Sequence, residues 1–228
     1  MELSARLKAI ADLINMGETV ADIGSDHGAL ALWAASRGCR VIATEYGDGP
    51  YHRLRRELAD KPAGPGIEVR QGDGLQVLRL READTVVVAG LGGDSIVNIL
   101  RHDRERAESM ARYIFQPMSR SRTLRELLYA WGWRISAEQP VWEKSRPFVI
   151  IVAHPDQVTV RPSPLALELG MSLLVPSQRD YLLYHRRRFI RLAEGLKLSA
   201  HEEAQARRLI YEGYIREMEM IIDGSYPA

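Results

Sequence analysis

Apolar residues in the first two thirds of the chain form short runs, and stretches with helical spacing lie between those runs. The short runs predict five strands, at residues 20–23, 40–45, 67–71, 85–89 and 112–116. The intervening stretches predict helices that begin near residues 3, 29, 48, 75, 94 and 123. Strands and helices therefore alternate, which predicts a doubly wound, Rossmann-like α/β sheet with parallel strands.

Two further apolar runs follow at residues 133–141 and 148–153. The segment that joins them, residues 143–147, is too short for a crossover helix, so we expect an antiparallel pair. The predicted sheet thus has seven strands and ends in a hairpin.

Glycines and capping residues set several of the predicted helix boundaries. Three helices are expected to end at Gly17, Gly38 and Gly132. Thr123 and Glu126 have capping-box spacing, so a helix is expected to begin there. The helix that opens at Asp48 is predicted to run to about residue 60, before a loop at 62–66.

The pattern changes after residue 154, where three prolines mark a boundary. Beyond it the signals are helical, and Ser177 and Ser199 have the spacing of helix N-caps. Two apolar stripes follow, one at Leu182, Leu183, Phe189, Ile190, Ala193 and Leu196, the other at Leu209, Ile210, Met218, Ile221 and Ile222. We expect two domains, residues 1–156 and 157–228, the second an antiparallel α-helical hairpin.

Composition narrows the class of protein. Of the 228 residues 46% are hydrophobic, which is enough for a sizeable core, and no apolar run is as long as a membrane helix. The N-terminus lacks a signal-peptide pattern, so we expect a cytoplasmic protein. Cys39 is the single cysteine, which excludes an internal disulfide and a cysteine-based zinc site, and the histidines show no metal-ligand spacing.

The net charge of +1 says little about partners, but the arginines are clustered. One cluster comprises Arg120, Arg122 and Arg125, and another comprises Arg186, Arg187, Arg188 and Arg191. Such clusters are usually solvated helix faces, and they are also the kind of surface that binds phosphates.

The first strand leads into a turn, residues 20–28, that has the form of a nucleotide-binding loop. Gly24 and Gly28 permit close approach of a ligand to the main chain, and the following helix presents free N–H groups. Asp26 stands where a dinucleotide fingerprint requires its second glycine. Asp22 and Asp26 would repel a pyrophosphate and suit a neutral or cationic ligand, such as the amino and sulfonium groups of S-adenosylmethionine. An ordinary turn with acidic N-caps is the alternative.

Three more loops leave the carboxyl ends of strands, where open α/β sheets bind ligands. Glu45 ends the second strand at the spacing of an acid that binds ribose hydroxyls. Asp73, between two glycines, is placed to accept from an adenine amino group, and the small residues of 89–93 leave space beside the ligand's reactive end. Each feature is common alone, but the four in order favour a methyltransferase over a generic fold.

Several short motifs make the resemblance specific. They are Leu3-Ser-x-Arg-Leu7, Asp22-Ile-Gly-Ser-Asp-His27, Asp48-Gly-Pro50, Arg70-Gln-Gly-Asp-Gly-Leu75, Ala89-Gly-Leu-Gly-Gly93 and Gln116-Pro117. Together they resemble the bacterial TrmK family of tRNA (adenine-N1)-methyltransferases, which modify adenine 22 in the D-arm. The resemblance covers residues 3 to about 154, and the predicted hairpin resembles that family's coiled-coil-like C-terminal domain. It implies a class I methyltransferase fold, S-adenosylmethionine as donor and tRNA as substrate.

The resemblance also suggests which residues bind the cofactor. They are Asp22, Gly24, Ser25, Asp26, His27, Gly28, Glu45, Gly72, Asp73, Gly74, Leu75, Ala89, Gly90, Leu91 and Gly92. The chain departs from the family pattern at two places. Leu91 replaces a usual Met, which conserves volume, and Met118 stands where the family commonly has Asn after Gln-Pro.

Chemistry and RNA binding add further candidates. Asp94 is a candidate to stabilise the positive charge of the methylated base, and His27 is a candidate general base, although contact with the ligand is the favoured role for His27. The target base must leave its stack, and basic residues are expected to hold the phosphates. The RNA-binding candidates are Arg6, Gly93, Gln116, Pro117, Arg120, Arg122, Arg125, Arg186, Arg187 and Arg188. We expect no metal, no membrane contact and a monomer.

Two other classes of function stay open from the sequence. One is a methyltransferase for a small molecule or a protein, in which the helical hairpin would serve dimerisation. The other is a non-catalytic RNA-binding protein with a degenerate methyltransferase fold. An NAD-dependent enzyme is disfavoured because the glycine fingerprint is missing.

Overall fold

The computed structural model describes residues 3–59, 61 and 66–225. The chain divides by its internal contacts into two compact units, residues 1–161 and 162–228. The predicted domain boundary, after residue 156, lies a few residues earlier. Within the described residues, no helix has both the length and the apolar character needed to cross a membrane.

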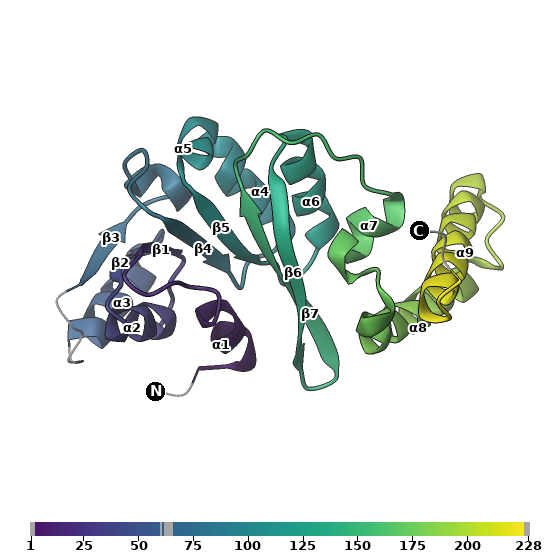
Figure 1. The fold of residues 1–228 in the computed structure, drawn as a ribbon, viewed down its shortest axis with the longest axis horizontal. Coiled ribbons are helices and arrows are strands. Elements are labelled where there is room, and N and C mark those ends of the chain that lie inside the picture. Colours follow the sequence, from purple (N-terminus) through teal and green to yellow (C-terminus); the bar gives the residue numbers. More distant parts are fainter. Residues whose placement is uncertain (1–2, 60, 62–65, 226–228) are drawn as a thin grey trace. The chain divides into compact units, whose positions relative to one another are not determined.

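The first unit is built on a seven-stranded sheet in the order β3-β2-β1-β4-β5-β7-β6 (Figure 1). Its strands are β1 (Thr19–Ile23), β2 (Arg40–Glu45), β3 (Ile67–Gln71), β4 (Thr85–Ala89), β5 (Arg112–Gln116), β6 (Arg134–Glu143) and β7 (Arg146–His154). The first five strands pair in parallel, and β7 is antiparallel to both β5 and β6. The predicted α/β sheet with an antiparallel last pair is confirmed.

Helices cover both faces of this sheet. They are α1 (Ala5–Ala11), α2 (Ala29–Ser36), α3 (Asp48–Ala59), α4 (Gly93–His102), α5 (Arg104–Ser109) and α6 (Ser121–Ala130), with a short 3₁₀ helix η1 (Gly74–Val77). On one face Ile10, Leu30 and Leu54 pack in one core cluster with strand residues such as Val20 and Val87. Neighbouring strand residues point to the opposite face and are also buried, so the sheet is apolar on both sides.

Two helix starts in the first unit are fixed in different ways, one by a side-chain cap and one by backbone conformation. Ser4 caps α1, since its hydroxyl accepts from the N–H of Leu7, and this helix is shorter than predicted. The prediction that α6 begins at Thr123 was wrong. It begins at Ser121, after Arg120 in the left-handed conformation with φ +52°, so the capping box is not used. The predicted end of α3 at residue 60 and most of the following predicted loop lie outside the described residues.

The second unit is helical, as predicted. It contains α7 (Pro164–Leu169), two 3₁₀ turns, α8 (Arg179–Leu196) and α9 (Glu202–Ile222). The last two helices pack along each other as a hairpin. Both predicted N-caps were wrong: α8 follows the 3₁₀ turn at Pro176–Gln178, and the N-cap residue of α9 is His201.

The predicted buried face of α9 also needs correction. Leu209 is 61% exposed and Ile210 is 51% exposed. The buried residues of this helix are Tyr214, Met218 and Ile221. The aromatic side chain of Tyr214 therefore lies on the buried face of α9, where the sequence pattern predicted only aliphatic side chains.

Candidate functional site

A cavity of about 490 Å³ opens at the carboxyl edge of the parallel strands. It is lined by Ser4, Arg6, Leu7, Asp22, Gly24, Ser25, Asp26, His27, Ala29, Leu30, Glu45, Pro50, Ala89, Gly90, Leu91 and Gln116. The loops after β1, β2 and β4 therefore meet there, together with α1 and the end of β5. Open α/β sheets bind ligands at this edge.

The loop after β1 is held in a fixed shape. The N–H groups of Gly24 and Ser25 both donate to the carbonyl of Thr44 on β2, at 3.1 and 3.0 Å. Gly28 has φ +66°, and a Cβ there would lie 2.8 Å from Cδ2 of Leu58. A side chain at residue 28 is disfavoured by the backbone conformation and would require the side chain of Leu58 on α3 to shift.

Two carboxylates face the cavity from neighbouring strands. Asp22 is buried and accepts a hydrogen bond of 2.6 Å from the hydroxyl of Ser25. Burial raises the pKa of Asp22 to about 6, and repulsion from Glu45 acts in the same direction, against the lowering effect of the Ser25 bond. Glu45 accepts from the main-chain N–H of Asp26 at 2.6 Å, which holds that residue at φ +51°.

His27 lies at the rim of the cavity, with 57% of its side chain exposed. Its Nδ1 lies 2.9 Å from Oε1 of Glu57 on α3. That hydrogen bond raises the pKa of His27, and the nearby charge of Asp26 adds to the effect. A raised pKa favours the protonated imidazole, which disfavours a general base and suits contact with a ligand.

The loop after β3 lies beside Glu45, because the N–H of Gly72 donates to the carbonyl of Glu45 at 2.9 Å. Residues 72–75 are not among those that line the cavity. Asp73 is part-exposed and lies 3.6 Å from Nδ1 of His102. The predicted cofactor residues 72–75 thus lie outside this cavity, next to the end of β2, and their contact with a cofactor stays a prediction.

The loop after β4 contributes main chain rather than side chains. The N–H of Gly90 donates to both oxygens of Gln116, at 3.1 Å to the carbonyl and 3.2 Å to Oε1. A Cβ at Gly93 would lie 2.2 Å from the carbonyl oxygen of Arg120, so α4 and the turn before α6 approach closely. Asp94 does not line the cavity, and its carboxylate lies 3.1 Å from Nη1 of Arg120.

Arg6 joins α1 to the far wall of the cavity. Its Nη1 donates to Oε1 of Gln116 at 3.2 Å and also contacts the sulfur of Met118. Its Nε lies 2.9 Å from Oε2 of Glu143, and its guanidinium lies 4.7 Å from the ring centre of Phe148. The predicted RNA ligand Arg6 is therefore engaged inside the protein, where it fixes the amide of Gln116.

Comparison with known proteins gives this site a family. A sequence-family model described as a methyltransferase domain matches residues 3–151. The crystal structure of the m1A22 tRNA methyltransferase TrmK of Bacillus subtilis has a TM-score of 0.83 and 25% identity, and the match covers 97% of this chain and 99% of that one. The curated tRNA (adenine(22)-N(1))-methyltransferase of B. subtilis is 33% identical over 173 residues, 75% of this chain and 73% of that protein. The chain belongs to the TrmK methyltransferase family.

A further relative of the TrmK fold has been solved with a ligand. The structure of Streptococcus pneumoniae Sp1610, a putative tRNA (m1A22) methyltransferase in complex with S-adenosyl-L-methionine, has a TM-score of 0.81 and 25% identity. The match covers 97% of this chain and all of that one. The resemblance that the sequence motifs suggested is therefore confirmed at the level of family and fold.

One predicted RNA ligand of this chain is excluded by its position. Arg125 is fully buried, and its Nε lies 2.7 Å from Oε1 of Glu138, which is also buried. A phosphate cannot reach it without opening the fold, so the prediction that Arg125 binds RNA was wrong. Its clustering with Arg120 and Arg122 along the sequence did not reveal that it faces β6.

The other predicted arginines differ in how free they are. Arg122 pairs with Glu126 at 2.7 Å on the surface of α6. In the second unit Arg186 pairs with Glu219, and Arg188 lies 3.6 Å from Glu168. Arg187 is exposed on α8 between those two. Their contact with RNA stays a prediction, as does that of Pro117 and Gly93.

Sequence reasoning missed several residues that line the cavity. Ser4, Leu7 and Pro50 belong to motifs that carried the family resemblance but were not expected at the site. Glu57, which holds His27, had no signal beyond its place on a helix. It lies 30 residues from His27 in sequence, and only the packing of α3 against the first loop brings them together.

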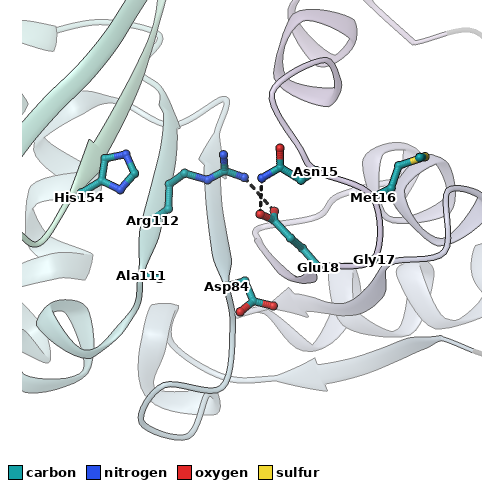
Figure 2. A pocket seen from close by; sticks show the side chains of 8 residues that line it. All are labelled: Asn15, Met16, Gly17, Glu18, Asp84, Ala111, Arg112 and His154. Carbon is teal, nitrogen blue, oxygen red and sulfur yellow. Dashed lines mark hydrogen bonds and ion pairs between the residues drawn. The ribbon is translucent and has the colours of Figure 1, made fainter.

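A second cavity, of about 560 Å³, lies at the opposite edge of the parallel strands (Figure 2). There Nη2 of Arg112 lies 2.8 Å from Oε2 of Glu18, and Figure 2 shows Asn15 reaching the same carboxylate. Asp84 accepts from the N–H of Thr19 at 2.8 Å. These charges tie the starts of β1, β4 and β5 together, so this cavity is part of the scaffold. No cluster of possible metal ligands occurs in the described part of the chain.

Proposed function

We propose that the protein transfers a methyl group from S-adenosylmethionine to N1 of adenine 22 in the D-arm of tRNA. The observation that carries this proposal is the curated relative of that activity, 33% identical over 75% of this chain. The cavity supports it, since loops of a methyltransferase sheet converge there with three carboxylates, those of Asp22, Asp26 and Glu45.

The residues present fit the cofactor. When bound, S-adenosylmethionine supplies a methyl group on a cationic sulfur. The N1 lone pair would form the new bond to this methyl group, and the S–C bond electrons would stay on the sulfur, which is neutral in S-adenosylhomocysteine. Glu45 accepts from the ribose hydroxyls, and Asp22 offers a buried carboxylate to the cationic part. Asp73 extends the site toward the adenine amino group. Ala89, Gly90 and Leu91 form an uncharged wall that leaves room for the methyl group.

The remaining cofactor candidates act through the main chain. These are Gly24, Ser25, Asp26, Gly28, Gly72, Gly74, Leu75 and Gly92, which shape the loops. Their value lies in close approach of the ligand, because hydrogen bonds from Gly24 and Ser25 to Thr44 on β2 fix the path of the first loop. A loop held in this way needs no reorganisation when ligand binds.

The transfer itself requires little acid–base chemistry, because adenine N1 carries a free lone pair. His27 contacts the cofactor side of the cavity rather than removing a proton. Gln116, whose amide is engaged by Arg6, Gly90 and the carbonyl of Pro117, forms a fixed wall of the cavity on the side of the target base. Asp94 lies at the start of α4, where it pairs with Arg120. Its carboxylate stabilises the positive charge of the methylated base by a long-range electrostatic interaction.

The tRNA is held by cations on the protein surface, among them Arg120, Arg122 and Arg187. The protein acts on tRNA in the cytoplasm. The protein acts as a monomer, since one chain supplies every loop of the proposed site.

The test uses methyl-labelled S-adenosylmethionine and two unmodified tRNA transcripts that differ only at position 22, adenine or guanine. Nuclease digestion then locates the label. We expect 1-methyladenosine from the first transcript alone. Label on both transcripts would place the target elsewhere, and label on neither, with cofactor bound, would exclude a tRNA substrate of this kind.

A further inference from the structure

The β6–β7 hairpin extends past the edge of the sheet at which the cavity opens. The last residue pair between β5 and β7 is Phe115 with Ile151. Beyond it β7 continues from Ile150 to Arg146, paired with β6 alone, as far as Glu143. Because β7 runs antiparallel to β5, this extension lies beyond the carboxyl end of β5. Figure 1 shows the hairpin projecting past the other strands beside α1.

This projection is anchored to the site at two points. Arg6, which lines the cavity, pairs with Glu143 at 2.9 Å and stacks over Phe148. Arg146 lies 4.9 Å from the same ring centre, and its Nη2 donates to the carbonyl of Met118 at 3.1 Å. The hairpin is thus fixed beside the segment that follows Gln116.

The tip of the hairpin, residues 142–146, has a composition that suits nucleic acid. Trp142 is 40% exposed, although tryptophan is usually well buried. Lys144 and Arg146 are exposed, and Lys144 adopts φ +56° in the turn. The acid of the tip, Glu143, already faces Arg6. An exposed indole flanked by two cations offers a stacking surface and partners for phosphates.

We propose that the tip of the β6–β7 hairpin binds the tRNA strand that flanks the target adenine. Trp142 stacks on a base that is unpaired when the adenine leaves its stack, while Lys144 and Arg146 lie against the neighbouring phosphates. This inference rests on the proposed function, because it assigns a tRNA contact to the rim of the same site.

The experiment compares two variants of the tip with matched variants at the opposite edge of the sheet. Trp142→Ala is paired with Leu80→Ala, since Leu80 is also half exposed. Lys144→Glu is paired with Arg81→Glu, since Arg81 is exposed and has φ +59°. Trp142→Phe keeps an aromatic face. Measured for each are tRNA affinity across a salt series, kcat/KM for tRNA, cofactor affinity and the melting temperature.

We expect Trp142→Ala to weaken tRNA binding between about 5-fold and 100-fold, Trp142→Phe to restore most of it, and Leu80→Ala to leave it unchanged. Lys144→Glu lowers the salt slope by about one, and Arg81→Glu does not. Cofactor affinity stays at the wild-type value in all variants.

The outcomes separate this inference from the proposed function. Wild-type enzyme that methylates adenine 22, with tip variants equal to their controls, would overturn the inference alone. Wild-type enzyme that labels no tRNA would overturn both. A lower cofactor affinity or a lower melting temperature in the tip variants would make the hairpin a structural support and overturn the inference.

Discussion

At the scale of single residues, Asp22 links cofactor binding to pH. Its pKa of about 6 leaves the carboxyl neutral at pH 5 and ionised at pH 7. The cationic cofactor prefers the ionised form, so its affinity is expected to be roughly tenfold weaker at pH 5 than at pH 7. S-adenosylhomocysteine has a neutral sulfur and should show a shallower dependence. Calorimetric titration of both ligands between pH 5 and 8 measures this, and equal slopes for the two would contradict it.

The same carboxyl makes a prediction about folding with the opposite sign. A folded-state pKa raised above the usual 3.8 means that the folded protein holds a proton which the unfolded chain releases. This contribution therefore favours the fold at low pH and weakens as pH rises through 4 to 6. Asp22→Asn should lose cofactor affinity at pH 7 without losing melting temperature, whereas a variant that merely unfolds would lose both.

Arg125 makes the cost of a buried charge measurable. Removing one partner of a fully buried ion pair leaves the other uncompensated, so Arg125→Met is expected to lower the free energy of unfolding by about 3–5 kcal/mol. Adding Glu138→Gln should recover part of that loss. Urea unfolding of the single and double variants gives both values. A single variant as stable as wild type but weaker in tRNA binding would restore the original prediction for this arginine.

At the scale of elements, the close approach of α4 to the turn before α6 depends on Gly93. A methyl group there would lie 2.2 Å from a main-chain oxygen of Arg120, and main chain cannot move aside as a flexible side chain can. Gly93→Ala should therefore lower the free energy of unfolding by more than about 2 kcal/mol and weaken cofactor binding through the loop after β4. Gly49→Ala, in the first turn of α3, is the control, since a Cβ there would meet no neighbouring atom within 4 Å. Equal stability of the two variants would remove this packing argument.

The elements also show what local sequence can predict. Four of the five parallel strands have the predicted bounds and β1 differs by one residue, because short runs rich in β-branched and aromatic residues lie between turn signals. Helix α5 was missed, since Arg104–Ser109 is mostly charged and buries only Ala107. The start of α6 was missed because Arg120 caps it by backbone conformation, which leaves no sequence signature.

The site was predictable to the extent that it lies at the carboxyl ends of strands. Asp22, Glu45 and Gly90 lie at or next to such ends, and all three line the cavity. Other cavity residues are oriented by partners from elements distant in sequence. Glu57 orients His27, and Arg6 orients Gln116. Their contacts arise from tertiary packing, which the spacing of residues along the chain does not encode.

At the scale of the whole molecule, a net charge of +1 does not indicate which arginines are available to a polyanion. In the second unit Arg186 pairs with Glu219, and Arg188 pairs with Glu168. Reversing the charges of residues 186–188 together would therefore break these ion pairs and also disturb the hairpin. Arg187→Glu is the cleaner test, because that side chain is exposed. We expect weaker tRNA binding and a salt slope lower by about one, with cofactor affinity and melting temperature unchanged. Arg187→Lys keeps the charge and should bind as wild type does. If Arg187→Glu binds tRNA as tightly as Arg187→Lys across the salt series, α8 does not contact the tRNA through this residue.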